Sequence, residues 1–179
     1  MKMDQPPDFI YIGQGQFAVS SDPKQVFSTV LGSCVSACLF DPIAGVGGMN
    51  HFLLPTANSK HEGDTNKFGA HSMEMLVNEL IKTGATRETM VAKAFGGANV
   101  TKSSGMVGRS NAQFVLQYLA NEGIACIAHS LGNSSARQLR FWPGTGKAKV
   151  KQIDNSILPE VVPMERSTRC SIQSKVTLF

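Results

Sequence analysis

Cys34 and His51 are the residues whose types and spacing could do chemistry. Cys34 lies in the segment Leu-Gly-Ser-Cys-Val, and His51 follows seventeen residues later in Gly-Gly-Met-Asn-His. A free thiol has a pKa near ~8.5, so a nucleophilic cysteine needs a neighbour such as imidazole to supply thiolate at neutral pH. The glycine two residues before Cys34 permits a sharp bend and leaves the backbone N–H groups of Gly32 and Ser33 uncrowded, as an oxyanion hole requires. The pair therefore makes Cys34 a candidate nucleophile with His51 as its base, and a buried, inert core thiol is the alternative interpretation of Cys34 at this point.

The other cysteines and histidines have plainer interpretations. Cys38 sits among apolar residues with no histidine placed for it, and we expect it in the core. A metal site built from Cys34, Cys38 and His51 is disfavoured, because zinc usually takes four ligands at tighter spacing. We therefore expect no metal and no cofactor. Surface or capping roles are expected of the remaining histidines, which are His61, His71 and His129.

The elements that must position Cys34 and His51 are mainly strands. Apolar runs bounded by turn residues predict strands, and the 3.6-residue apolar period predicts two helices. The predicted strands are 9–13, 16–20, 25–31, 35–40, 46–54, 89–95, 124–129, 137–142 and 148–153, and the predicted helices are 68–83 and 111–122. This order is not a strict strand–helix alternation, so a mostly antiparallel, layered α+β arrangement is favoured over a doubly wound parallel sheet. If 35–40 and 46–54 pair about the turn at 41–45, His51 lies beyond strict pairing with Cys34, and only the bend at Gly32 brings them together.

Composition sets the outer limits. The chain has 179 residues, 42% of them apolar and 17% charged, which suits one globular domain. We expect that domain over residues 1–155 and a loosely held C-terminal extension over 156–179. The formal charge of +4 could suit nucleic acid or an acidic protein, but no motif supports nucleic acid. The densest basic run, Lys147-Ala-Lys149-Val-Lys151, alternates like the solvent face of a strand.

The start of the chain and its thiols predict a compartment. Residues 1–8 have no apolar stretch typical of a signal peptide, and no apolar run approaches the ~20 residues that span a bilayer. The four cysteines show no CxxC spacing, which favours reduced thiols over a disulfide framework. We expect a cytoplasmic protein that does not insert into a membrane, with a monomer as the default state.

A longer block of residues resembles the CheD family of chemoreceptor glutamine deamidases. The block is Ser28-Thr-Val-Leu-Gly-Ser-Cys-Val-Ser-Ala-Cys-Leu-Phe-Asp-Pro, followed by Gly-Val-Gly-Gly-Met-Asn-His-Phe-Leu-Leu-Pro. Later segments, Lys67-Phe-Gly-Ala, Ala94-Phe-Gly-Gly-Ala, Gly108-Arg-Ser-Asn111 and Leu131-Gly-Asn, also resemble the family. The resemblance covers about residues 10 to 155. It implies a layered α/β sandwich related to the folds of glutamine-deamidating toxins.

The resemblance also implies a catalytic triad of cysteine, histidine and a hydroxyl. Cys34 and His51 match the family's nucleophile and base. The family's threonine, six residues before the cysteine, corresponds to Ser28, with Thr29 beside it. Because neighbours in a strand point to opposite faces, only one of the two can serve, and position favours Ser28.

The activity implied is hydrolysis of receptor glutamine side chains to glutamate. The implied partners are the cytoplasmic domains of methyl-accepting chemotaxis receptors and, in some organisms, a CheC-type phosphatase. Two alternatives remain open at this point. One is an adaptor that acts by binding receptors or the phosphatase without catalysis, and the other is a cysteine amidase or protease acting on small amides.

Overall fold

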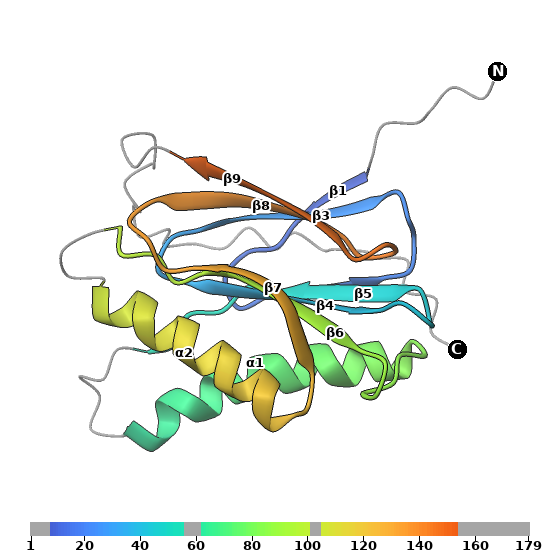
Figure 1. The fold of residues 1–179 in the computed structure, drawn as a ribbon, viewed down its shortest axis with the longest axis horizontal. Coiled ribbons are helices and arrows are strands. Elements are labelled where there is room, and N and C mark those ends of the chain that lie inside the picture. Colours follow the sequence, from blue (N-terminus) through green and yellow to red (C-terminus); the bar gives the residue numbers. More distant parts are fainter. Residues whose placement is uncertain (1–7, 56–61, 101–104, 154–179) are drawn as a thin grey trace, which may run out of the picture.

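The computed structural model describes residues 8–55, 62–100 and 105–153, in which two helices and nine strands alternate as β-β-β-β-β-α-β-α-β-β-β (Figure 1). This is the order that the sequence predicted. The strands are β1 Asp8–Tyr11, β2 Phe17–Ser20, β3 Gln25–Leu31, β4 Val35–Asp41, β5 Val46–Asn50, β6 Val91–Gly96, β7 Ala125–Leu131, β8 Ala136–Trp142 and β9 Lys147–Ile153. The helices are α1 Glu62–Lys82 and α2 Gly105–Asn121.

Two sheets and a pair of helices form three layers. The outer sheet has the order β1-β3-β8-β9, and the central sheet has the order β2-β5-β4-β6-β7. Both helices lie against the face of the central sheet that is turned away from the outer sheet, so neither α1 nor α2 covers the outer sheet (Figure 1). Within the described chain, the pairs β1–β3 and β6–β7 are parallel and the other five are antiparallel. The layered, mostly antiparallel α+β sandwich is therefore confirmed.

Strand β4 is buried on both sides because it lies in the middle layer. Successive side chains of a strand point to opposite faces. Val35, Ala37 and Leu39 accordingly pack in the core beneath the helices. Cys38 belongs to the second core, between the two sheets, and Cys34 and Phe40 pack against that core. The face of β4 that carries Cys34 is thus the face turned toward the outer sheet.

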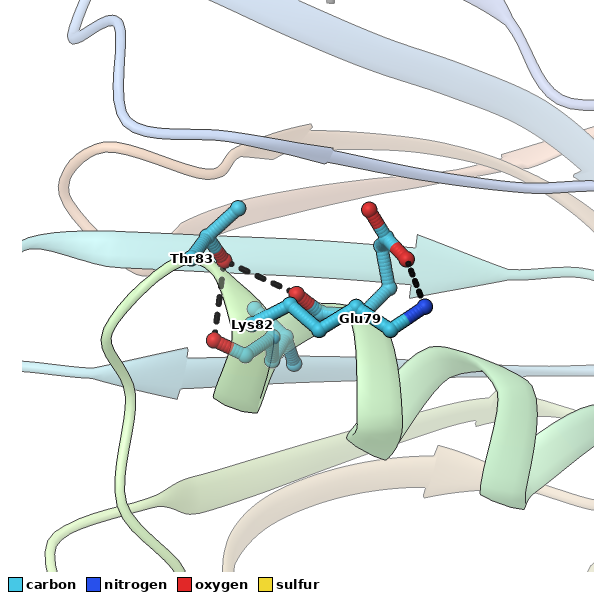
Figure 2. A network of polar contacts seen from close by, with 4 residues as sticks. Glu79, Lys82 and Thr83 are labelled. Atoms are coloured by element: carbon cyan, nitrogen blue, oxygen red, sulfur yellow. Dashed lines mark hydrogen bonds and ion pairs between the residues drawn. The ribbon is translucent and has the colours of Figure 1, made fainter. Parts of the chain in front are cut away.

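Helix α1 presents its apolar residues to the central sheet and ends where its backbone is capped. Met73, Leu76, Val77 and Leu80 are fully buried at the expected helical spacing. At the C-terminus the Thr83 hydroxyl donates to the carbonyls of Glu79 and Leu80, at 3.0 and 2.8 Å, and Lys82 pairs with Glu79 at 3.1 Å (Figure 2). Gly84 follows with a φ of 105°, a left-handed conformation that ends the helix at little steric cost.

The boundaries differ most from expectation in three places. Helices α1 and α2 each begin six residues earlier than predicted, because their first turns carry few apolar residues and so show no periodicity. Strand β5 ends at Asn50, although an isolated bridge continues its pairing at Phe52. The predicted extension at 156–179 lies outside the described residues. Among the helices of the described chain, none is long and apolar enough to cross a membrane.

Candidate active site

Strand pairing itself brings Cys34 and His51 together. Strands β4 and β5 pair antiparallel from Asp41↔Val46 to Cys38↔Met49, and the same register continues to the bridge Val35↔Phe52. This register puts His51 diagonally across from Cys34 on the face turned toward the outer sheet. The His51 Nε2 lies 2.9 Å from the Cys34 Sγ. The expectation that strict pairing would leave His51 out of reach was therefore wrong, since the pairing runs past the last residue of β5.

The third side chain at the site is Thr29, and the preference for Ser28 is corrected. In β3, Phe27 and Leu31 face the core between the sheets, and Thr29 shares their side. The Thr29 Oγ1 lies 2.9 Å from the His51 Nδ1, and Thr29 is fully buried. Ser28 pairs with Tyr11 and Arg140, both exposed, so its side chain is on the opposite face of the outer sheet.

The partners of His51 identify which ring nitrogen carries the proton. The carbonyl of Ile12 accepts a hydrogen bond from the Thr29 hydroxyl at 2.7 Å and also lies 3.2 Å from the His51 Nδ1. A carbonyl can only accept, and the single Thr29 proton is already donated to it. We therefore infer that Nδ1 is protonated and donates to Thr29 and Ile12. The Nε2 lone pair then faces the thiol of Cys34, as a general base requires.

Burial keeps the resting pair neutral. His51 is 5% exposed. Burial raises the pKa of the Cys34 thiol above its usual value, and backbone hydrogen bonds from Gly32 and Cys34 partly oppose this shift. Burial lowers the pKa of His51, and the hydrogen bond to the Ile12 carbonyl opposes that change. Both directions disfavour a resting thiolate–imidazolium pair, so proton transfer is expected as the sulfur attacks.

The bend that presents Cys34 is fixed through its carbonyl oxygens. The Gly32 carbonyl accepts from the backbone N–H of Ala98 at 2.7 Å, and the Cys34 carbonyl accepts from Gly97 at 2.8 Å. The side chain of Asn111 donates to the Ser33 carbonyl at 3.0 Å. Because a carbonyl is coplanar with the N–H group of the next residue, holding these three carbonyls also fixes the directions of the N–H groups in the bend. Gly32 and Ser33 thus stay the predicted oxyanion donors.

A close approach at Gly96 explains one glycine of the Gly96-Gly97 pair. The φ of Gly96 is 113°, and a Cβ there would lie 2.1 Å from the carbonyl oxygen of Cys34. Any side chain would push the end of β6 away from the nucleophile. Gly96 therefore allows β6 to lie directly against the bend.

Asn111 is a site residue that the sequence analysis did not single out. It is fully buried in α2, and its carbonyl oxygen accepts from the Leu54 N–H at 2.7 Å while its amide donates to Ser33. It therefore fixes the residue that precedes Cys34 and the segment that follows His51. An asparagine inside an amphipathic helix is a weak helix former, and that was the available signal that its side chain is used elsewhere.

The remaining predicted positions do not join the site. Cys38 is buried in the core between the sheets, as expected. His71 and His129 are exposed, as expected, while His61 lies outside the described residues. In the part of the chain that the structure describes, no group of three or more histidine, cysteine or acidic side chains is placed to hold a metal ion.

Comparison with known proteins gives the family. A family model described as "CheD chemotactic sensory transduction" matches residues 53–152. A protein of Cereibacter sphaeroides named "Probable chemoreceptor glutamine deamidase CheD" is 47% identical over 156 residues, covering 87% of this chain and 76% of that protein. Proteins of the same name from Agrobacterium fabrum and Rhizobium leguminosarum are 46% and 45% identical, with coverage of 87% and 88% of this chain and 86% of each relative.

A match of this length includes both site residues. Any stretch of 156 residues in a chain of 179 contains Cys34 and His51, although the family model itself begins two residues after His51. Among solved structures, Neisseria meningitidis protein NMB0706 superposes with a TM-score of 0.46 at 10% identity, covering 72% of this chain and 65% of that one. The sequence relatives carry the assignment, and by them the chain belongs to the CheD family.

Proposed function

We propose that this protein is a chemoreceptor glutamine deamidase in which Cys34 is the nucleophile, His51 the general base and acid, and Thr29 the group that orients His51. The observation that carries the proposal is the continuous hydrogen-bonded chain from Thr29 through His51 to Cys34. Relatives at 43–47% identity over most of the chain carry the name of this activity. The reaction is hydrolysis of a protein glutamine side chain to glutamate with release of ammonia.

Acylation begins with the neutral pair. As the Cys34 Sγ attacks the carboxamide carbon, the His51 Nε2 accepts the thiol proton and a C–S bond forms. The carbonyl oxygen becomes an oxyanion, for which we propose the backbone N–H groups of Gly32 and Ser33 as donors. The His51 proton passes to the amide nitrogen, the C–N bond breaks, and ammonia leaves a thioester on Cys34.

Deacylation uses the same groups in reverse. The His51 Nε2 takes a proton from water as the water oxygen attacks the thioester carbon, and a second oxyanion forms. Collapse of this intermediate breaks the C–S bond, releases glutamate and returns the proton to sulfur. One water is consumed and one ammonia is released per glutamine. The substrate gains one carboxylate at each event.

The test uses a receptor cytoplasmic fragment as substrate. We expect a mass gain of about one dalton per modified site, the change from amide to acid in this chemistry. Cys34→Ala should produce none. If the wild-type protein produces no gain, or Cys34→Ala produces an equal gain, the chain is not a deamidase, and pulldown by Cys34→Ala would then support the adaptor alternative.

The family also supplies narrower proposals about setting and partners. We propose that the protein acts in the cytoplasm, as a monomer, on the cytoplasmic domains of methyl-accepting receptors, and that a CheC-type phosphatase is a second partner where one is encoded. Support comes from the family relation alone. Co-purification with such a phosphatase, and a concentration-independent mass in sedimentation, are the expected results.

A further inference from the structure

The exposed face of the outer sheet concentrates positive charge. Cross-strand register places Lys147 beside Trp142, Lys149 beside Arg140 and Lys151 beside Gln138. These side chains share one face, because directly opposite residues in an antiparallel pair point the same way. We call Arg140, Lys147, Lys149 and Lys151 the basic face, and all four are exposed.

Among the residues that the structure describes in the outer sheet, the basic face has no acid to balance it. Strands β3, β8 and β9 contain no aspartate or glutamate, and the single acid of β1, Asp8, alternates with Phe9 and so lies on the other side. None of the four cations forms an ion pair within the described residues. Arg140 and Lys149 are like charges directly opposite each other, an arrangement that destabilises a sheet. An anionic partner on this face would relieve that repulsion.

Two of the cations lie over aromatic rings of the same face. The Arg140 guanidinium is 5.3 Å from the centre of the Phe9 ring, and the Lys149 ammonium is 5.8 Å from that of Trp142. A nucleic acid that binds an open sheet usually stacks its bases on free aromatic rings. Here Phe9 and Trp142 each have a cation over the ring, although Phe9 and the neighbouring Tyr11 are still exposed. The preference for an anionic side chain over a base therefore rests on the row of cations itself.

The spacing along β9 matches a row of acids on a helix. Alternate strand residues are about 6.7 Å apart, so Lys147, Lys149 and Lys151 span about 13 Å. Acids at i, i+4 and i+8 on a helix are about 6 Å apart, and the difference over the whole row is within the reach of lysine side chains. Strand β9 therefore offers three cations in single file at the spacing of one helix face.

The line of lysines along β9 leads toward the end of the molecule that holds the active site. Strand β9 runs from Lys147, beside Trp142, to Ile153, beside Ala136. The next residue of β8, Arg137, pairs with Leu31, three residues before Cys34. A helix aligned on β9 therefore extends toward the end of the sandwich that holds the catalytic residues.

We propose that the basic face is a docking surface for an acidic helix of the substrate protein, which aligns along β9 and delivers a glutamine elsewhere in the substrate to Cys34. This proposal rests on the proposed deamidase function. The electrostatic contact would raise the rate of productive encounter more than it would change the chemical step.

The test is charge reversal with a matched control. Lys147→Glu/Lys151→Glu leaves both cation–π pairs intact and keeps charge on the edge strand, which protects it from edge-to-edge association. The control, Lys67→Glu/Lys82→Glu, makes the same charge change on α1, in the layer farthest from the outer sheet (Figure 1). It also removes the Lys82–Glu79 ion pair, so urea unfolding must show that the control is still folded under the assay conditions. We expect kcat/KM on a receptor cytoplasmic fragment to fall by about tenfold or more for the β9 variant, with kcat preserved at saturation. The control should fall by less than about twofold.

Further measurements separate the outcomes. The alkylation rate of Cys34 by iodoacetamide should be the same in all variants, which shows that the active site is intact. The wild-type kcat/KM should decline with added salt, and the β9 variant should show a flatter decline. Equal kcat/KM for the β9 variant and wild type overturns the docking proposal while leaving the deamidase function standing. Loss of binding to anionic phosphatidylglycerol vesicles with unchanged receptor kinetics also overturns it, in favour of a membrane contact. If wild type does not modify the fragment, the proposed function fails first.

Discussion

Cys34, the residue just before β4, and Cys38, within β4, face the same side of the central sheet and differ in their surroundings. Cys34, at the mouth of the core between the sheets, is half-buried and faces His51. Cys38, four residues further along the chain and deeper in the core between the sheets, is 1% exposed, and burial raises its pKa far above the usual range. Around Cys34 the core admits Thr29, His51 and a carbonyl, whereas Cys38 has mainly apolar neighbours and no histidine, with Lys93 opposite it in β6.

Strand alternation places both thiols in the core between the sheets, and the neighbouring side chains determine the reactivity of each thiol. Beyond Cys38 the layer opens into a pocket of about 330 Å³ lined mainly by apolar groups, among them Phe40, Ile127 and Phe141. At the Cys34 end, every polar atom of the His51 ring has a partner. A reactive cysteine needs that partnered polar environment, and a structural one needs its absence.

The largest effect separates the two thiols. Cys34→Ala should lower kcat on a receptor fragment by about 10⁴-fold or more, because no other group can form the thioester. Cys38→Ala should keep most of the activity and lower the free energy of unfolding by about 1–2 kcal/mol through lost packing. Rate assays and urea unfolding of both variants measure this. Comparable activity loss in Cys38→Ala with an unchanged fold would contradict the comparison.

Next comes the pair of adjacent hydroxyls. Thr29→Val should lower kcat by about 10- to 100-fold, since His51 loses the group that orients it while the shape of the side chain is conserved. Ser28→Ala, on the other face of β3, should retain activity within about twofold. Thr29→Ser should restore most of the loss because it returns the hydroxyl. A larger loss of kcat in Ser28→Ala than in Thr29→Val would instead assign the orienting role to Ser28.

The pH dependence of alkylation sharpens the contrast further. Burial raises the pKa of Cys34 and lowers that of His51, so the thiol is neutral at pH 7. The iodoacetamide rate at Cys34 should therefore climb about tenfold per pH unit up to the thiol pKa. Cys38 should stay unmodified over the same range in the folded protein. Peptide mass spectrometry resolves the two sites, and a Cys34 rate already at its plateau at pH 6 would point instead to a resting ion pair.

The smallest effect concerns the far end of β4. Asp41 accepts hydrogen bonds from Ile43, Ala44, Thr86 and Thr89. Burial alone would raise the pKa of Asp41, but these bonds lower it to about 2. The unfolded chain, with its ordinary value of 3.8, therefore binds the proton first as the pH falls.

Asp41 thus stabilises the protein above pH 3.8, and this contribution is lost as the pH falls toward 2. Asp41→Asn should lower the unfolding free energy by about 1–3 kcal/mol at pH 7, and by less near pH 2. Deamidase activity at 25 °C should be unchanged, because the triad lies at the other end of the strand. Equal destabilisation of the variant at both pH values would contradict a stabilising role for the ionised Asp41 carboxylate.

Most of the fold could be predicted because its strands are short, apolar and separated by strong turn signals. The Asp41-Pro42 turn and the Gly144-Thr-Gly146 turn each join the strands they were expected to join. Helix starts were missed because their first turns lack apolar residues. The division into two sheets depends on pairings between distant strands, such as β3 with β8, and local patterning carries no information about those.

The site divides along the same line. Residue type and spacing, together with the family resemblance, pointed to Cys34 and His51. The preference for Ser28 over Thr29 was wrong, because the Thr29 hydroxyl is the one beside His51. Strand β3 reads Gln-Val-Phe-Ser-Thr-Val-Leu, with apolar residues at both parities, so its sequence does not reveal which face is inward. Only the packing of Phe27 and Leu31 between the sheets decides that Thr29 faces His51.

The hydrogen-bonded triad also crosses the boundary between two layers. Thr29 and the Ile12 carbonyl come from the outer sheet and the segment after β1, while His51 and Cys34 come from the central sheet. A chain whose two sheets were apart would keep the Cys34–His51 pair but lack the hydroxyl and the carbonyl that orient the imidazole. The triad is therefore complete only while the two sheets are packed against each other.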